Sequence, residues 1–298
     1  MNHLYQKGKQ IVAVMLTVIL TSVLAISAPA ISVRAEGEQY ELQVNRGAAC
    51  VTVYQYIPDE TNPAGPAIKV PIRSFACSPG TGTRTPVRTT QTTEYYRWRF
   101  MGSCWTQYAV RFNGRVLFHS ILFNSANPAS LSASSYNLLG EKASHGCVRL
   151  SVNDSKWIYD HCPRGTTVTV YDDPTNPGPI GKPEMIDMNL KDPRHRWDPT
   201  DPDEANPWRS DWHSIESRNE TGILTVAKGQ GPEHLADDLI IKAVDGTPLT
   251  PDQMRVQIQG YYNLNKVGRY TVWVTVWNLN TGIPVEKEFG LLVLDKKA

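Results

Sequence analysis

Residues 270–277 of the chain have the sequence YTVWVTVW, in which β-branched and aromatic side chains alternate strictly. A period of two is the pattern of a β-strand with one buried face. The same alternation appears at 50–56 (CVTVYQY), at 108–112 and at 166–171 (TTVTVY), while 289–294 (FGLLVL) indicates a fully buried strand. We therefore predict a mainly β protein. The 270–277 stripe is interpreted as core packing, with a sugar-binding aromatic platform as the alternative.

A proline-rich stretch separates two β regions. Proline recurs throughout 174–212 with Asp and Asn between, and no periodicity survives there. This composition is typical of an extended linker, and its three tryptophans indicate that it partly docks onto a domain. With 298 residues the chain is long enough for about two domains. We predict a first domain at 38–173, a linker at 174–214 and a second domain, a small β-sandwich, at 215–298.

One helix interrupts the first β region. Ser151, Asn153 and Asp154 are residues that cap helix N-termini, and Pro163 is placed to end the helix about three turns later. The first domain is therefore expected to be a β-sandwich with one or two short helices.

The charge balance excludes a nucleic-acid binder. Lys and Arg number 30 and Asp and Glu 29, so the formal net charge is +1, whereas a nucleic-acid-binding domain needs a basic face. Hydrophobic residues make up 41% of the chain, which is ample for a core.

The N-terminus indicates the compartment. Lys7 and Lys9 precede a mostly apolar run at 11–26, and small residues follow, with candidate cleavage sites after Ala30 or Ala35. This is the pattern of a secretory signal peptide, and the run is shorter than the roughly 20 apolar residues of a spanning helix. We predict a signal peptide at residues 1–35, with an uncleaved N-terminal membrane anchor as the alternative. Either interpretation places the rest of the chain outside the cell.

The segment at 143–150, ASHGCVRL, combines the residue types of nucleophilic catalysis. His145 and Arg149 each lie two residues from Cys147, and nearby bases or cations activate a thiol. Gly146 would allow a close approach to an acyl substrate, with N–H groups around Gly146 and Cys147 as an oxyanion hole. The predicted helix begins just after and would favour the thiolate. The alternative is a structural, buried cysteine.

A second histidine lies 28 residues upstream of Cys147. His119 follows Val116-Leu117-Phe118, a hydrophobic strand context. A base on a neighbouring strand would face the sulfur. The alternative is a core histidine with a satisfied hydrogen bond.

The run from Ser144 to Cys147, followed by an apolar residue and Arg149 and preceded by His119-Ser120, resembles the signature of the L,D-transpeptidases. The resemblance covers roughly residues 40–173 and implies a YkuD-like β-sandwich catalytic domain. Tyr95 to Trp98 and Gly140 also have counterparts in that family. The C-terminal 80 residues resemble a bacterial immunoglobulin-like domain.

The resemblance implies roles for individual residues. Cys147 would be the nucleophile and His119 the general base, with the backbone carbonyl of Ser120 orienting the imidazole. The remaining signature residues would support the site, namely Ser144, His145, Gly146 and Arg149. His145 would shape the pocket or act as a supporting base. Arg149 would stabilise the site or bind a substrate carboxylate, or alternatively pair with an acidic residue.

The reaction implied is acyl transfer on peptidoglycan in the cell wall. Cys147 would attack the tetrapeptide stem between its third and fourth residues, release D-alanine, and pass the acyl group to an amine of a neighbouring stem, forming a 3→3 cross-link. Carbapenems would acylate the same thiol. No metal or organic cofactor is required. The alternatives are an L,D-carboxypeptidase or cysteine peptidase on the same scaffold, and a non-catalytic wall-binding protein.

Two departures from the family pattern concern loops. The stretch between His119 and Ser144 is longer than in the common form, and 127–137 is expected to form a lid or a rim of the substrate cleft. Thr85-Pro86-Val87-Arg88 stands where the family often has glycine after Thr-Pro, which leaves the shape of this loop open.

Five cysteines is an odd number for a secreted protein. If Cys147 is the free thiol, four others remain to pair, and we predict one or two disulfides within the catalytic domain, with free buried thiols as the alternative. These four are Cys50, Cys77, Cys104 and Cys162. His161 beside Cys162 has no partner pair at zinc spacing, and it is interpreted as a C-terminal helix histidine.

Overall fold

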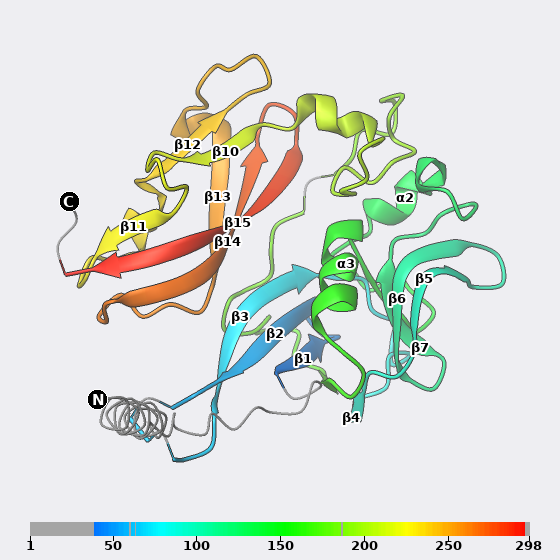
Figure 1. The fold of residues 1–298 in the computed structure, drawn as a ribbon. Helices are drawn as coiled ribbons and strands as arrows, with labels where there is room; N and C mark the ends of the chain where they lie inside the picture. Colours follow the sequence, from blue (N-terminus) through cyan, green and yellow to red (C-terminus); the bar gives the residue numbers. More distant parts are fainter. Residues whose placement is uncertain (1–38, 60, 63, 186, 296–298) are drawn as a thin grey trace, which may run out of the picture. The chain divides into compact units, whose positions relative to one another are not determined.

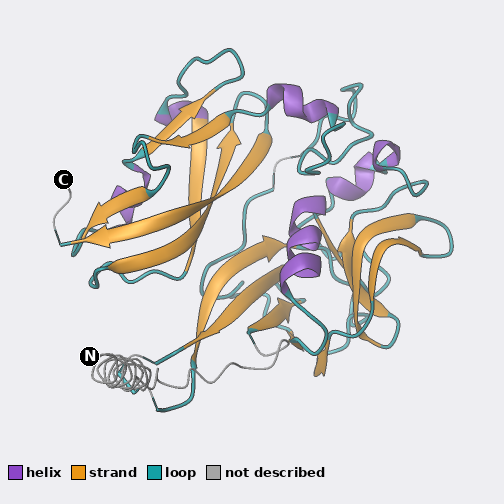
Figure 2. Ribbon diagram, in the orientation of Figure 1, coloured by secondary structure: helices purple, strands orange, loops and turns teal. Residues whose placement is uncertain are grey.

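The computed structural model describes residues 39–295, except 60, 63 and 186. The predicted signal peptide or anchor at 1–35 lies outside these residues. Within the described part of the chain, no helix is both long and apolar enough to cross a membrane. Strands far outnumber helices (Figure 2), so the prediction of a mainly β protein is confirmed.

The first β region contains two sheets (Figure 1). One has five strands in the order β3-β2-β1-β9-β4, antiparallel except where β1 runs parallel to β9. The other has four strands in the order β5-β6-β7-β8, antiparallel except where β7 runs parallel to β8. The strands are β1 (Tyr40–Asn45), β2 (Cys50–Ile57), β3 (Ile68–Ala76), β4 (Arg88–Gln91), β5 (Tyr95–Phe100), β6 (Trp105–Asn113), β7 (Val116–Ser120), β8 (Val148–Leu150) and β9 (Thr167–Tyr171).

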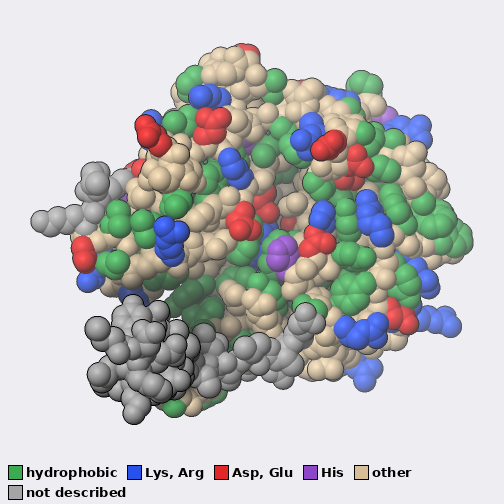
Figure 3. All heavy atoms as spheres, in the orientation of Figure 1, with side chains coloured by type: hydrophobic (Ala, Val, Ile, Leu, Met, Phe, Trp, Pro, Cys, Tyr) green, Lys and Arg blue, Asp and Glu red, His purple; other side chains and the backbone are tan. Residues whose placement is uncertain are grey.

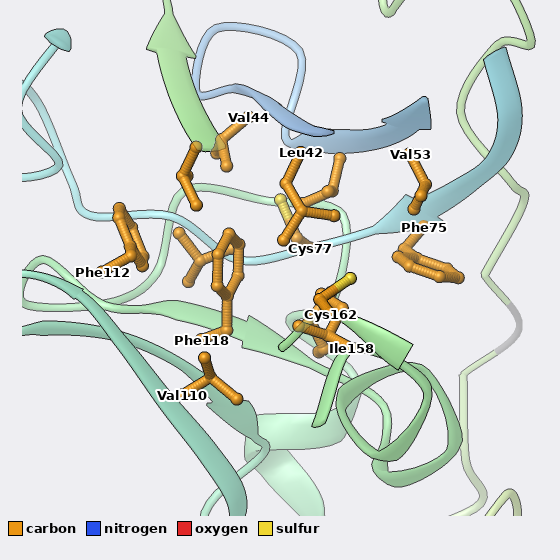
Figure 4. Packing of buried hydrophobic residues seen from close by; sticks show 14 of the residues in the cluster. Leu42, Val44, Val53, Phe75, Cys77, Val110, Phe112, Phe118, Ile158 and Cys162 are labelled. Atoms are coloured by element: carbon orange, nitrogen blue, oxygen red, sulfur yellow. The ribbon is translucent and has the colours of Figure 1, made fainter. Parts of the chain in front are cut away.

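A single apolar core joins these two sheets to helix α3 (Val152–His161). Leu42 and Val53 come from the first sheet, Phe118 from the second and Ile158 from the helix, and Figure 4 shows them converging. The helix begins as predicted, because the Ser151 hydroxyl accepts the Asp154 N–H at 3.1 Å and caps its first turn. It ends before Pro163.

The predicted role of 127–137 as a lid or a rim of the substrate cleft stays a prediction. This segment contains the short helices η1 (Pro128–Ser130) and α2 (Ala133–Tyr136). Leu131 and Tyr136 are buried in a cluster with Met188 and Trp208. Its apolar side chains therefore pack against the proline-rich stretch at 174–212.

The proline-rich stretch docks as its tryptophans indicate, but it is not extended. The indole of Trp208 donates to the Trp197 carbonyl at 3.1 Å, and that of Trp212 donates to the Pro199 carbonyl at 3.2 Å. Between them Asp198, Asp201 and the short helix η2 (Pro207–Asp211) fold the chain into successive turns. Side-chain carboxylates that accept backbone N–H groups replace the missing periodic structure.

The second β region has its own core. A four-stranded sheet has the order β11-β15-β14-β13, and β10 pairs with β12. Val272, Val274 and Val276 are fully buried in β14, which confirms core packing for the 270–277 stripe. Similarity to an immunoglobulin domain stays a prediction. The elements are β10 (Ser214–Ser217), β11 (Leu224–Ala227), η3 (Pro232–Ala236), β12 (Leu239–Lys242), η4 (Pro251–Gln253), β13 (Met254–Gly260), β14 (Gly268–Asn278) and β15 (Ile283–Leu294).

Charges of both signs are interspersed over the face in Figure 3. This mixture agrees with the near-zero net charge.

Candidate active site

The parallel pairing of β7 with β8 brings the predicted site residues together. Phe118 pairs with Val148, and His119 pairs with Arg149. Side chains alternate between the faces of a sheet. Phe118 and Val148 enter the core, so His119 and Arg149 share the opposite face. Cys147 lies just before β8, two residues from Arg149, and its thiol donates to the Arg115 carbonyl at 3.8 Å.

The loop that carries Cys147 is held by the side chain of Ser144. Its hydroxyl accepts the Gly146 N–H at 2.9 Å and donates to the Cys147 carbonyl at 2.5 Å. Ser144 is buried. The supporting position predicted for Ser144 is thus next to the backbone of the candidate nucleophile.

This bond changes one expectation about the oxyanion hole. Because the Gly146 N–H already donates to Ser144, it is not free to bind a developing oxyanion. The N–H of Cys147 is the remaining donor of the predicted pair. Gly146 has another task, because its φ of 143° lies in the region that favours glycine and a Cβ there would be 3.1 Å from the Arg84 carbonyl oxygen.

A second loop, residues 78–85, packs directly against the cysteine loop. Ser78 exchanges backbone hydrogen bonds with Arg149 at 2.8 and 3.0 Å. A Cβ on Gly80 would be 2.9 Å from the Gly146 Cα, so the two backbones meet with no side chain between them. The Thr85 hydroxyl accepts the Gly80 N–H at 2.7 Å and donates to the Gly146 carbonyl at 2.8 Å.

The imidazole of His119 has one defined hydrogen bond. Its Nδ1 lies 2.5 Å from the backbone carbonyl oxygen of Ser120. A carbonyl only accepts, so Nδ1 carries the proton and Nε2 keeps its lone pair. Burial lowers the pKa of His119 to about 4, with the nearby Arg149 charge acting in the same direction and the Ser120 bond opposing it. At neutral pH His119 is therefore an unprotonated base.

The thiol of Cys147 rests protonated. Burial raises its pKa, and the Leu117 backbone together with the charges of Arg149 and Arg111 offsets this only in part. The expectation that the surroundings favour a thiolate is therefore wrong for the resting protein, because loss of hydration outweighs the nearby positive charges. A neutral thiol and a neutral imidazole are groups between which a proton can pass during nucleophilic attack.

The guanidinium of Arg149 is buried beside this pair. It donates to the Ala143 carbonyl at 3.3 Å, and no ion pair among the described residues includes it. Its Nε, also buried, has no hydrogen-bond partner within the described part of the chain. Burial lowers its pKa. The alternative of a structural ion pair for Arg149 is thus not what the structure contains.

The other two predicted supporting residues differ in their surroundings. Ser120 is buried, and its hydroxyl accepts the Gln107 N–H and donates to the Ile121 carbonyl, both at 2.8 Å. His145 is exposed. The roles assigned to all of these residues remain predictions.

The five cysteines are all free, so the prediction of one or two disulfides is wrong. Cys50, Cys77 and Cys162 are completely buried and behave as small apolar side chains. Burial raises the pKa of Cys50 to about 12 and raises those of Cys77 and Cys162 strongly. Cys104 and Cys147 are the two that retain partial exposure. The three buried thiols, Cys50, Cys77 and Cys162, are therefore expected to be chemically inert.

Sequence reasoning missed three residues that shape the site. Thr85 and Gly80 form the contact with the cysteine loop described above. Arg46 donates to the Thr85 carbonyl at 2.8 Å and to Asp172 at 2.8 and 2.9 Å. The Thr-Pro step was visible in the sequence, but nothing local links it to a cysteine 62 residues later.

The described residues contain no cluster of three or more His, Cys, Asp or Glu side chains suited to a metal ion.

Comparison with known families agrees with this geometry. Residues 67–170 match the family model of the L,D-transpeptidase catalytic domain, YkuD. The matched segment begins next to β3 and includes His119, Ser144 and Cys147. The match covers about a third of the chain and marks this segment as similar to the YkuD-type L,D-transpeptidase catalytic domain.

Individual relatives match over shorter parts of their length. A protein of Bacillus subtilis (strain 168) described as a candidate L,D-transpeptidase, YciB, is 38% identical over 58 residues, which span 20% of this chain and 29% of that relative. L,D-transpeptidase 3 from Mycobacterium tuberculosis is 24% identical with a TM-score of 0.33, covering 45% of this chain and 61% of that one. An L,D-transpeptidase, LdtMt1, solved in complex with imipenem, is 22% identical with a TM-score of 0.34, covering 45% and 59%.

Proposed function

We propose that this protein is a peptidoglycan L,D-transpeptidase that forms 3→3 cross-links through a thioester on Cys147. One observation carries the proposal: the β7–β8 register pairs His119 with Arg149, two residues from Cys147, and the Ser120 carbonyl fixes the imidazole so that Nε2 is the basic atom. A wall-binding protein without catalysis has no need of a nucleophile and an oriented base.

The first half of the reaction forms the thioester. The Cys147 sulfur attacks the carbonyl carbon between the third and fourth residues of a tetrapeptide stem while its proton passes to Nε2 of His119. The Cys147 N–H would stabilise the oxyanion. When the C–N bond breaks, His119 returns the proton to the departing amine, and D-alanine leaves.

The second half transfers the acyl group. An amine of a neighbouring stem attacks the thioester carbon, His119 accepts a proton from it, and the thiolate leaves and is reprotonated. Arg149 has a buried guanidinium with spare hydrogen-bonding capacity, and it would hold a carboxylate of the donor stem. Water in place of the amine would make the protein an L,D-carboxypeptidase.

The proposed place of action is the cell wall. The Lys7–Lys9 and apolar N-terminal pattern supports secretion, with retention at the membrane as the alternative.

The test incubates purified protein with disaccharide-tetrapeptide and identifies the products by mass spectrometry. A cross-linked dimer that has lost one D-alanine supports transpeptidation. Tripeptide alone supports the carboxypeptidase, and unchanged substrate with both the parent and Cys147→Ala supports a wall-binding protein.

Carbapenems provide an independent test of the nucleophile. Their strained β-lactam carbonyl is an acyl donor for a thiol, and one similar solved structure is of an L,D-transpeptidase in complex with imipenem. We expect a mass increase equal to one carbapenem, located on the peptide containing Cys147. An active protein that shows no such adduct would refute this part of the proposal.

A further inference from the structure

The backbone on both sides of Cys147 is held by two buried hydroxyl groups. Ser144 binds the carbonyl of Cys147 itself at 2.5 Å. Thr85 binds the carbonyl of the preceding residue, Gly146, at 2.8 Å. Thr85 has no exposed surface and Ser144 has 2%. Ser144 belongs to the signature around the cysteine, whereas Thr85 comes from a different part of the chain.

We propose that Thr85 is a positioning residue for Cys147, acting by fixing the peptide unit between Gly146 and Cys147. The inference rests on the proposed function for its catalytic consequence, but the positioning itself is a property of the folded loop.

The direction of the Thr85 hydroxyl bond is unambiguous. Its oxygen accepts the Gly80 N–H at 2.7 Å, and a carbonyl can only accept, so the hydroxyl proton points to the Gly146 oxygen. Both neighbours are backbone groups that the close packing of Gly80 on Gly146 brings within reach. Removing the hydroxyl would leave a buried donor and a buried acceptor unpaired.

The consequence for Cys147 follows from peptide geometry. In a planar trans peptide the C=O and N–H point in opposite directions. Holding the Gly146 oxygen toward Thr85 therefore directs the Cys147 N–H away from the 78–85 loop. This N–H is the donor left for an oxyanion once Ser144 has engaged the Gly146 N–H. Thr85 thus sets the orientation of that donor and of the Cα from which the thiol projects.

Thr85 is itself held from the far side. Arg46, whose side chain is 10% exposed, donates to the Thr85 carbonyl at 2.8 Å and to the Thr83 carbonyl at 3.4 Å. Its other nitrogens bind Asp172 at 2.8 and 2.9 Å. The loop therefore has a fixed anchor in the turn that follows strand β1, and Thr85 has little freedom to follow a displaced cysteine loop.

The chain contains a matched control. Thr92 is 1% exposed, and its hydroxyl also joins a backbone N–H to a carbonyl, accepting from Thr166 at 3.0 Å and donating to Pro163 at 2.7 Å. These partners lie beyond the C-terminal end of α3 and not in the cysteine loop. Thr92→Val therefore removes an equivalent buried hydroxyl without touching Cys147.

The experiment compares Thr85→Val, Thr85→Ser and Thr92→Val in the full chain. The readouts are the iodoacetamide alkylation rate of the Cys147 peptide, kcat and KM on the tetrapeptide, and the free energy of unfolding. We expect both valine variants to lose similar stability. Thr85→Val should slow alkylation, because the thiol then projects from a displaced Cα. It should lower kcat by about tenfold or more with KM little changed, because a misdirected donor acts in the transition state. Thr92→Val should stay within about twofold of the parent, and Thr85→Ser within about threefold.

Two results would overturn the inference. In one, Thr85→Val has the alkylation rate and kcat of Thr92→Val. In the other, Thr85→Ser is as impaired as Thr85→Val, which would assign the effect to the methyl group. A parent protein inactive on tetrapeptide would refute the proposed function, while the alkylation rates would still decide the role of Thr85. An active parent with an unimpaired Thr85→Val variant would support the proposed function and refute the role of Thr85.

Discussion

Each β region contains a sheet that ends in a parallel pair of strands, and only one of these pairs has a polar, buried outer face. In the second region β11 lies beside β15. Leu224 with Leu291 and Val226 with Val293 fill the core face of this pair, while the pairs on its outer face, Thr225 with Leu292 and Ala227 with Leu294, are half-buried and uncharged. In the first region β8 lies beside β7, and the apolar pair of Phe118 and Val148 is followed by the pair of His119 and Arg149.

The two strand pairs differ in the side chains that their outer faces carry. Burying a histidine and an arginine lowers both pKa values, and this costs free energy that an apolar pair does not incur. Such a cost is typical of functional sites. The β11–β15 edge therefore serves packing, and the β7–β8 edge serves chemistry. The following predictions test that division.

The largest effect is expected from the nucleophile. Cys147→Ser should reduce tetrapeptide turnover by more than about a thousandfold, because a hydroxyl without a matched base is a poor substitute for a thiol. Cys50→Ala, a change at a buried thiol, should retain the parent kcat per folded molecule. Turnover is measured by mass spectrometry of the products. Substantial turnover by Cys147→Ser would remove Cys147 from the mechanism.

The next effect is expected from the base. His119→Gln keeps a polar side chain but cannot accept the thiol proton, so kcat should fall by about a hundredfold to ten-thousandfold. Carbapenem acylation of Cys147, followed by mass, should slow in parallel. If only KM changed, His119 would be a binding residue and the assigned pair would be incorrect.

A smaller effect, on stability alone, is expected at the apolar edge. Leu291→Ala should lower the free energy of unfolding by about 2–5 kcal/mol, since it empties a fully buried position in the second core. Below the unfolding transition, kcat should match that of the parent. Denaturant unfolding and product formation measure the two quantities. A large fall in kcat of the folded variant would contradict the division of labour between the two edges.

The smallest effect concerns acid stability. The pKa of His119 is about 4 in the folded protein against an ordinary value of 6.5. Between these values the unfolded chain binds more protons, so stability falls as pH decreases from about 6.5 to about 4, by up to about 3 kcal/mol. His119→Gln should remove this contribution, and the difference in unfolding free energy between variant and parent should change across that window. A difference independent of pH would show that His119 titrates normally.

Much of the fold was predictable because local patterns and tertiary burial agree. Strands at 50–56 and 270–277 and the helix after Ser151 occur where alternation and capping place them. The turns of 174–212 and the packing of 127–137 were not predictable in form. Both depend on contacts between Leu131, Tyr136, Met188 and Trp208, which no period within either segment encodes.

The cysteines show where counting fails. An odd number of thiols and a secretory N-terminus favoured disulfides, yet Cys50, Cys77 and Cys162 are core side chains. Whether two cysteines pair depends on the distance and direction of their Cβ atoms, and the number of cysteines contains no information about either.

The sequence by itself determined the mainly β fold, the position of the helix after the cysteine loop, and Cys147 and His119 as the candidate pair, because each of these is a pattern within a few consecutive residues. Only the tertiary structure decided that His119 pairs with Arg149 beside the cysteine loop, that the thiol rests protonated, and that Thr85 holds the peptide before Cys147. These properties arise from strand register, burial and backbone contacts between segments far apart in the chain.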